Sequence, residues 1–357
     1  MTRTVTYMLR TYNHERFVRE AVRSAFAQDY HPLQIVITDD ASSDRTYDNI
    51  VEEVRQYSGP HEILVNRNTH RMRSIEALTH AMSMAQGEFV VMAHGDDVSL
   101  PHRTAALVSA WREHGVSMVS SNAQFIDRRG TKYNLTCPNS VSRRISAEDI
   151  LKWNWLWEML GATVGYEPEV LTKFEPLTAR SLATGADYVL PMRATMLKGF
   201  YFVEQPLVQY RRHATNMGNF IEDRTTTRLA RDETAIANYV ISRVRVLDDL
   251  PVLEAEQPGN AVLKKLRKRL EAQLLIDLRR WCRLRTELCA SAQLPTWVAE
   301  KRMLARRLRP ELSIWYGKEP FGVKATRWLN STPAWRLVKL FRWFSKNVWR
   351  GDPMRRW

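Results

Sequence analysis

The feature that most constrains the fold is a regular alternation of short apolar runs and helix-patterned segments in the first hundred residues. Residues 5–9 form a β-rich run, and a helical pattern follows near residues 15–27. The alternation continues with predicted strands at 34–38, 62–65 and 89–92 and predicted helices near 47–56 and 75–85. Strands that alternate with helices form a mostly parallel sheet covered on both faces. The sequence therefore predicts an α/β fold with a Rossmann-like sheet flanked by helices.

Polar segments follow three of these predicted strands. They occupy residues 10–13, 39–43 and 94–97. Ligands of such sheets bind beyond the carboxyl ends of the strands. We therefore expect the three segments to converge on one crevice.

The second half of the chain has a different pattern, which is helical and basic. Apolar side chains recur there at helical spacing among many Lys and Arg residues: Leu263, Leu266, Leu270, Leu274, Leu278 and Trp281. Pro251, Pro258 and Gly259 lie where we expect a join between segments. We predict an α/β domain over residues 1–220, a helical accessory region over 221–330 and a basic amphipathic tail over 331–357.

The composition of the chain restricts the kinds of partner and the cellular compartment that we expect for it. Lys and Arg outnumber Asp and Glu by 53 to 39, and the formal charge of +14 favours phosphates, nucleic acid or acidic lipid headgroups. The 3 cysteines form no zinc-spaced set with histidines, which indicates a reducing compartment. The sequence shows no leader pattern and no apolar run that could span a bilayer. We expect the protein in the cytoplasm.

The tail has the pattern of a membrane-surface helix. Leu337, Phe341 and Phe344 fall on one helical face, whereas Arg336 and Lys339 fall on another. This pattern favours peripheral contact with the anionic inner face of a membrane. The alternative is a helix that docks its apolar face on the first domain.

Several ordered motifs carry a family resemblance. Thr11-Tyr12-Asn13 and the run from Ile35 to Thr46, which contains Asp39-Asp40, resemble the opening of family 2 glycosyltransferases. The resemblance extends over about the first 215 residues. It implies a GT-A fold and an inverting transfer of a sugar from a nucleotide diphosphate to an acceptor hydroxyl. The acceptor would be a saccharide or a lipid-linked saccharide, in cell-surface polysaccharide or glycolipid synthesis.

The resemblance places the nucleotide at the first motifs. Asp39 would accept hydrogen bonds from the base or ribose, with Asp40 beside it, and the remaining nucleotide-binding candidates are Thr11, Tyr12, Asn13, Arg73 and Asp96. Arg71 lies near Arg73 in a segment that can also reach phosphate. The alternative for Asp39 or Asp40 is that it caps the next helix.

The segment His94-Gly95-Asp96-Asp97 resembles the family's acidic metal motif, which holds Mg²⁺ or Mn²⁺ against the diphosphate. His94 replaces the usual first acid. Asp96 is therefore the main candidate ligand, Asp97 a second ligand or an orienting residue, and His213 a further candidate. The alternative is a polar turn before a helix that starts near Pro101.

Asp187 lies where the family presents its catalytic base. Ala186 replaces the usual preceding acid, and Arg193 follows as in the family pattern. The alternative, which is compatible with catalysis, is that Asp187 caps a helix over residues 188–197.

Two further groups are candidates by resemblance. Arg211 and Arg212, in the segment that closes the domain, are expected near the diphosphate. Trp155 and Trp157 are expected to line the acceptor groove, because aromatic faces are good platforms for sugar rings, although core packing explains them equally well.

Two other functions compete with this interpretation. A nucleotidyltransferase normally has a Gly-rich, basic phosphate loop near the N-terminus, and residues 11–15 are not one. A basic protein that only binds nucleic acid or membrane would leave the acidic segments around Asp39, Asp96 and Asp187 unexplained. Nucleic acid is therefore not an expected partner.

Overall fold

The computed structural model describes residues 4–72, 74–153, 157–177, 186–213 and 228–290. The chain divides into two compact units. The first unit contains residues 1–179 and 186–216, and the second contains residues 180–185 and 217–357. The predicted boundary at residue 220 lies outside the described residues.

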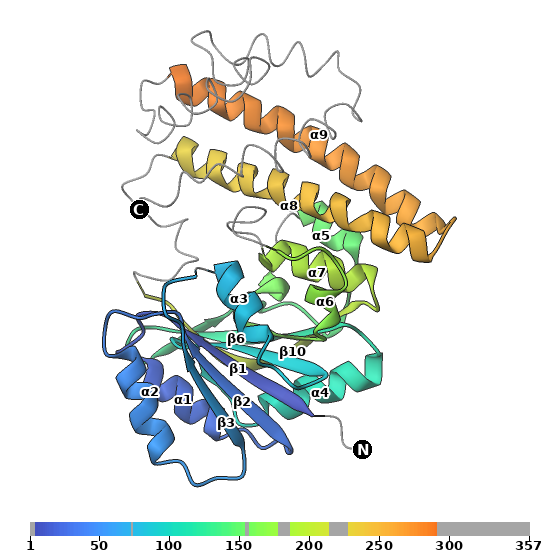
Figure 1. Ribbon diagram of the computed structural model, residues 1–357. Helices are drawn as coiled ribbons and strands as arrows, with labels where there is room; N and C mark the ends of the chain where they lie inside the picture. Colours follow the sequence, from blue (N-terminus) through green and yellow to red (C-terminus); the bar gives the residue numbers. More distant parts are fainter. Residues whose placement is uncertain (1–3, 73, 154–156, 178–185, 214–227, 291–357) are drawn as a thin grey trace. The chain divides into compact units, whose positions relative to one another are not determined.

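Four parallel strands form the first half of the sheet. They are β1 (Val5–Thr11), β2 (Leu33–Asp39), β3 (Glu62–Arg67) and β4 (Phe89–His94), in the order β3-β2-β1-β4. The sequence predicted all four strands and their parallel direction. β1 lies between β2 and β4, so the loops that follow these three strands meet at one edge of the sheet (Figure 1).

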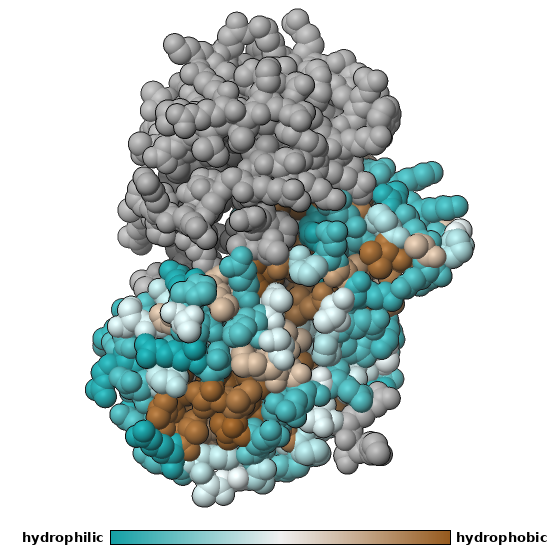
Figure 2. Space-filling view, in the orientation of Figure 1, coloured by the Kyte–Doolittle hydropathy of each residue, from teal (hydrophilic) through white to brown (hydrophobic). Residues whose placement is uncertain are grey.

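The alternation of side chains along β1 explains how helices cover the sheet. Val5, Tyr7 and Leu9 belong to a buried cluster that also contains residues of α1 (Val18–Phe26), α2 (Thr46–Arg55) and α4 (Arg103–His114). Met8 points to the opposite face, as the period of two in a strand requires. Helix α3 (Ser74–Met82) buries Ile75, Leu78 and Ala81 apart from that cluster. In Figure 2, brown apolar residues lie over the part of the sheet that contains β2 and β3, where the Leu64 side chain is exposed.

The second half of the sheet is mixed. Its order continues β4-β9-β6-β10-β5, where β9 (Val164–Tyr166) is antiparallel to both neighbours and β6 (Met118–Ile126) is parallel to β10 (Phe200–Arg211). β5 (Val98–Ser99) pairs antiparallel with β10, so the residues just after Asp97 join the strand that carries Arg211. The remaining elements of this unit are β7 (Lys132–Leu135), β8 (Arg143–Ile145), α5 (Ala147–Trp153), α6 (Glu169–Thr172), α7 (Ala186–Met196) and short 3-10 turns at Trp157–Met159 and Gly161–Thr163.

The described part of the second unit contains two long helices, α8 (Arg228–Glu256) and α9 (Ala261–Ala290). The turn between them includes Gly259 at φ 86°, and α9 lies along α8 (Figure 1). The leucines predicted to share a helical face are buried: Leu263, Leu266, Leu270, Leu274 and Leu278. Pro251 lies inside α8, so it does not mark a join as expected. Within the described residues, no helix is long and apolar enough to cross a membrane. The predicted tail, residues 331–357, lies outside them.

Candidate functional site

The polar segments after β1, β2 and β4 are held together by backbone hydrogen bonds. Arg10 pairs in register with His94, and Thr11 pairs with Asp39. Beyond the strands, the Asp40 N–H donates to the Thr11 carbonyl at 3.0 Å, and the Gly95 N–H donates to the Arg10 carbonyl at 2.9 Å. The predicted convergence of these segments is confirmed.

Asp39 is enclosed and organises the loop that follows β2. Its side chain is fully buried. Oδ1 accepts hydrogen bonds from Thr11 Oγ1 at 3.1 Å and Ser42 Oγ at 2.5 Å, and Oδ2 accepts from the Ser42 N–H at 2.9 Å. Neither Asp39 nor Asp40 caps α2, because the carboxylate that binds the Thr46 N–H at its start is that of Asp44. The capping alternative is therefore wrong.

Asp40 lies closer to the surface of the same loop. Its Oδ1 accepts from Asn68 Nδ2 and from the Met72 N–H, both at 2.8 Å. These bonds tie the loop after β3 to the loop after β2. The exposed fraction of Asp40 is 9%, compared with 0% for Asp39, so Asp40 is the member of the pair nearer to the surface.

The Tyr12-Asn13 segment forms the adjoining wall. The Arg71 guanidinium lies 3.9 Å above the Tyr12 ring. Asn13 has φ 53°, and its Oδ1 accepts from the Ser43 N–H at 3.0 Å. Asparagine tolerates this left-handed conformation better than most residues. Asn13 therefore fixes the shape of this loop, and the Tyr12 ring is the flat side chain that the loop presents.

Asp96 lies in a turn after β4 among histidines. Its Oδ2 is 3.0 Å from His213 Nε2 and 3.8 Å from His14 Nε2. Burial is the strongest influence and opposes ionisation, but the hydrogen bond with His213 and the nearby His14 and His94 rings outweigh it and lower the pKa of Asp96. A Cβ on Gly95 would come within 2.8 Å of His14 Nδ1 and 2.7 Å of Thr11 Cγ2, so a side chain at this position would push the loops apart.

Asp97 is anchored to the protein. Its Oδ1 accepts from the Arg211 N–H at 2.9 Å, and its Oδ2 has no hydrogen-bond partner among the described residues. Burial and the neighbouring Asp96 charge raise the pKa of Asp97 well above its usual range. The bond between Oδ1 and the Arg211 N–H fits an orienting residue.

Arg211 and Arg212 differ in their surroundings. The buried Arg211 guanidinium donates to the Asp96 carbonyl at 3.0 Å and to Glu20 Oε2 at 2.6 Å, so it supports the acidic loop from within. The Arg212 guanidinium is half-buried, 5.7 Å from the centre of the Phe125 ring.

The Asp96–His213 pair has a geometry suited to a divalent ion. Two ligand atoms at right angles around an ion with bonds of about 2.1 Å lie roughly 3 Å apart. Asp96 Oδ2 and His213 Nε2 have this separation, 3.0 Å. Within the described ranges no group of three or more His, Cys, Asp or Glu side chains is arranged to hold a metal. The two atoms are hydrogen-bonded to each other here, and an ion held by them would take its other ligands from phosphate and water, as Mg²⁺ commonly does.

Asp187 lies in the first turn of α7, which starts at Ala186. It is therefore inside the helix, and the prediction that it caps this helix is wrong. Burial raises the pKa of Asp187 to about 6, and the Arg10 charge partly opposes this effect. A Cβ on Gly161 would lie 2.6 Å from Asp187 Oδ1, so the absence of a side chain there makes room for the carboxylate.

Two residues that were not named as site candidates interact with these carboxylates. The Arg10 guanidinium interacts electrostatically with both Asp40 and Asp187. Burial raises the pKa of Tyr210, and the charges of Asp97, Asp96 and Asp187 raise it further. The acidic pairs and Asp187 therefore belong to one electrostatic neighbourhood. The sequence did contain one indication that Arg10 belongs to the site, namely its position at the end of a predicted strand.

Three predicted site residues lie wholly or partly outside the described part of the chain. Arg73 and Trp155 lie outside the described residues, and for Trp157 only the backbone, in the turn Trp157–Met159, is described. The predicted Arg193 of the Asp187 segment is buried, and it donates to the Val170 and Glu175 carbonyls. Arg193 thus holds α7 in the core.

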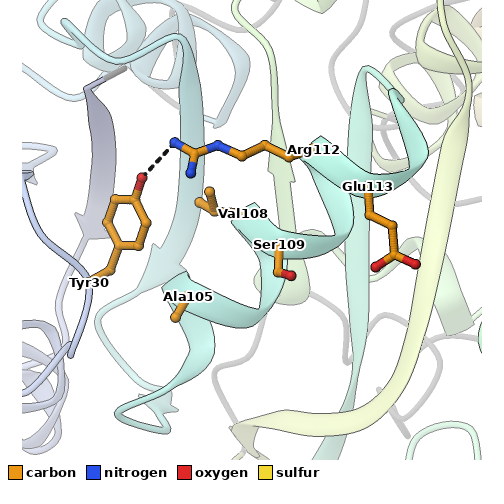
Figure 3. A pocket seen from close by; sticks show the side chains of 6 residues that line it. All are labelled: Tyr30, Ala105, Val108, Ser109, Arg112 and Glu113. Atoms are coloured by element: carbon orange, nitrogen blue, oxygen red, sulfur yellow. Dashed lines mark hydrogen bonds between the residues drawn. The ribbon is translucent and has the colours of Figure 1, made fainter. Parts of the chain in front are cut away.

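A separate hollow lies on the outer side of α4 (Figure 3). It is lined by Tyr30, Ala105, Val108, Ser109, Arg112 and Glu113. Arg112 Nη2 donates to the Tyr30 hydroxyl at 3.0 Å across it. None of the residues of the acidic loops lines this hollow, so it is separate from the candidate site.

The sequence and the fold are similar to those of known glycosyltransferases. Residues 8–162 match the family described as glycosyl transferase family 2. The chain is 29% identical over 110 residues to the putative glycosyltransferase EpsE of Bacillus subtilis, a match that covers 31% of this chain and 39% of that protein. This chain thus spans well under two thirds of that relative's length.

An Escherichia coli relative has a more specific name. WfgD, a UDP-Glc:alpha-D-GlcNAc-diphosphoundecaprenol beta-1,3-glucosyltransferase, is 20% identical over 138 residues, which are 39% of this chain and 53% of WfgD.

The fold is similar to that of Staphylococcus aureus TarS in complex with UDP. The TM-score is 0.56 at 14% sequence identity, and the match covers 99% of this chain and 93% of the TarS chain. With the ordered motifs, these matches show that residues 8–162 are similar to glycosyltransferase family 2 and that the chain has the GT-A fold.

Proposed function

We propose that this glycosyltransferase transfers a sugar from a nucleotide diphosphate to an acceptor hydroxyl with inversion at the anomeric carbon. We further propose a saccharide or lipid-linked saccharide acceptor and a role in cell-surface polysaccharide or glycolipid synthesis. The name of the WfgD relative, with a UDP-linked donor and a diphosphoundecaprenol-linked acceptor, supports this substrate class.

The nucleoside would bind at the loop after β2. The Arg71 guanidinium covers one face of the Tyr12 ring, and the base would stack on the other face. Asp40 would accept hydrogen bonds from the base or ribose, while Asp39, Thr11 and Asn13 hold the loop in shape. Arg73 keeps its proposed role at the phosphates.

The diphosphate would lie against Asp96 and His213. These residues would hold Mg²⁺ or Mn²⁺, and the bound ion would neutralise charge on the departing diphosphate. Asp97 would orient the loop through the Arg211 N–H, and the half-buried Arg212 would add positive charge nearby.

Asp187 would be the catalytic base. A base works best when its pKa lies just below the working pH, so that it is ionised yet still basic, and the pKa of about 6 for Asp187 meets this condition. The carboxylate would take the proton of the acceptor hydroxyl as its oxygen attacks the anomeric carbon and the bond to the diphosphate breaks. One displacement of this kind inverts the configuration. Trp155 and Trp157 remain proposed as the platform for the acceptor sugar.

The observation that carries the proposal is that the charges of Asp96 and Asp187 both act on Tyr210 and raise its pKa, while Asp187 also interacts with the Arg10 guanidinium. Its test is a screen of nucleotide sugars against the full chain, with and without Mn²⁺, in which thermal stability and release of nucleoside diphosphate are both measured. A donor that raises the melting temperature only with the metal, and is then turned over, is the expected result. No binding or turnover of any donor, with salt-sensitive binding of RNA or DNA instead, would refute the proposal.

A further inference from the structure

Helix α9 has a strongly basic exposed face. Between Ala261 and Leu284 it contains 8 basic residues and 2 acidic ones. Arg267 is half-buried and pairs with Glu254. The other basic side chains are exposed, and we call them, together with Val262 and Ile276, the basic face: Lys264, Lys265, Lys268, Arg269, Arg279, Arg280 and Arg283.

The acids of this stretch of α9 are few and lie mostly off the basic face. Asp277 is buried and pairs with Arg243, and Glu271 is half-buried. A helix that faces only water usually gains stability from acids placed four residues from its bases, and like charges at that spacing repel each other. The basic face contains such repulsive pairs, for example Lys264 with Lys268 and Arg279 with Arg283. An anionic partner would relieve this repulsion.

Two aliphatic side chains indicate what kind of partner fits. Val262 is 72% exposed and Ile276 is 55% exposed, and at 100° per residue both lie on the same side of the helix as Lys265, Arg269 and Arg283. Aliphatic side chains among cations suit a lipid surface, where the cations bind headgroups and the aliphatic groups enter the acyl boundary. A surface for single-stranded nucleic acid would instead present aromatic side chains for stacking, and Trp281 is only half-exposed.

We propose that the basic face of α9 binds the anionic headgroups of a membrane surface, with Val262 and Ile276 inserted at the boundary. The helix spans about 45 Å at 1.5 Å per residue, which is enough for both groups of cations, Lys264–Arg269 and Arg279–Arg283, to contact lipid at once. This surface is distinct from the tail at residues 331–357, and the proposal does not depend on the transferase reaction.

The test is sedimentation of the full chain with vesicles of phosphatidylglycerol and phosphatidylcholine, and with vesicles of phosphatidylcholine alone. Binding is expected only to the anionic vesicles and is expected to weaken with salt. Each cation near an anionic surface raises the affinity for that surface by a factor of about five. The triple variant Lys268→Glu/Arg279→Glu/Arg283→Glu should therefore bind the vesicles at least about 100-fold more weakly. The control Arg55→Glu/Arg129→Glu/Lys132→Glu changes the net charge equally through exposed residues of the first unit and should have a much smaller effect.

A second variant separates the aliphatic contribution from charge. Ile276→Ser should weaken vesicle binding by about tenfold with an unchanged salt dependence, because it removes apolar area and no charge. Circular dichroism and the melting temperature check folding, and the milder Lys268→Gln/Arg279→Gln/Arg283→Gln replaces the charge reversal if that variant unfolds. Equal loss of binding in the first-unit control, wild-type binding by the α9 variants, or α9-dependent binding of a single-stranded RNA in place of vesicles would overturn the proposal.

Discussion

The acidic pairs at the ends of β2 and β4 lie on either side of β1. In the first pair the first acid is bound within the protein, whereas in the second pair the second acid is. After β2 the first acid, Asp39, is enclosed by its hydrogen bonds and the second, Asp40, is nearer to the surface. After β4 the first acid, Asp96, contacts His213, whereas the second, Asp97, is bound to the Arg211 backbone.

The point at which each strand ends explains the difference. β2 continues through Asp39, whose side chain turns inward to Thr11 of the neighbouring strand, and the chain then turns at Ala41 with φ 57°. β4 ends at His94, so both acids of its pair lie in a turn closed by a 3.2 Å bond from the Asp97 N–H to the His94 carbonyl. A shift of two residues in the end of a strand therefore changes which carboxylate of the pair binds a backbone N–H group beside the strand.

The largest effect is expected at the carboxylate outside both pairs. Asp187→Asn should lower kcat by about 10²- to 10⁴-fold, because the amide cannot accept the acceptor proton. Release of nucleoside diphosphate measures turnover, and donor-induced thermal stabilisation should stay at the wild-type level. Unchanged turnover in this variant would remove Asp187 from the role of base.

The pair after β4 should show the next largest effect and the clearest asymmetry. Asp96→Asn should lower turnover by about 10²- to 10³-fold, as expected when charge stabilisation of the leaving group is lost. Asp97→Asn keeps an oxygen that can accept from the Arg211 N–H and should lose less than about tenfold. Titration of Mn²⁺ in both variants adds a second measurement, since only Asp96→Asn should need more metal for donor binding. Equal losses in the two variants would contradict the proposed division of roles.

In the pair after β2, we expect substitution of one acid to affect donor binding and substitution of the other to affect stability. Asp40→Asn should raise the donor KM about tenfold with little change in melting temperature. Asp39→Asn should lower the melting temperature more, because hydrogen bonds to a buried charged group contribute about 1.5–3 kcal/mol each. Thermal melts and donor titrations of both variants decide this. The opposite pattern, a stable Asp39→Asn protein with weak donor binding, would instead assign the base contact to Asp39.

Much of the first unit was predictable because its elements depend on local pattern. The strands ending near Leu9, Thr38 and Met92 and the helices between them follow from alternating apolar periodicity, and the structure only extends the strands by one or two residues. The antiparallel β9 and the bulged pairing of β10 with β6 depend on contacts between residues far apart in the chain. No local pattern encodes such contacts.

The sequence predicted which segments form the site better than it predicted what each residue does there. The sequence identified Asp96, Asp187 and His213, and the structure places His213 Nε2 3.0 Å from Asp96 Oδ2. Arg211 was expected near phosphate, but its guanidinium is bound by the Asp96 carbonyl and Glu20. An arginine that supports a loop and one that binds phosphate have the same sequence signal, and only burial and partners distinguish them.

The smallest effect concerns pH and distinguishes Asp187 from both pairs. Its pKa of about 6 predicts that kcat falls about tenfold per pH unit below 6, because the base must be ionised. The burial that makes Asp187 a better base also lowers the stability of the folded protein when Asp187 is ionised. The folded-state pKa lies above the ordinary value of 3.8, so ionisation of Asp187 costs folding free energy as the pH rises through this interval. Asp187→Asn should therefore melt at a higher temperature than the wild type at pH 7, and the difference should vanish near pH 4. Melts across this range check the prediction, and a variant that is less stable than the wild type at pH 7 would show that the Asp187 carboxylate is held by favourable contacts that outweigh its desolvation.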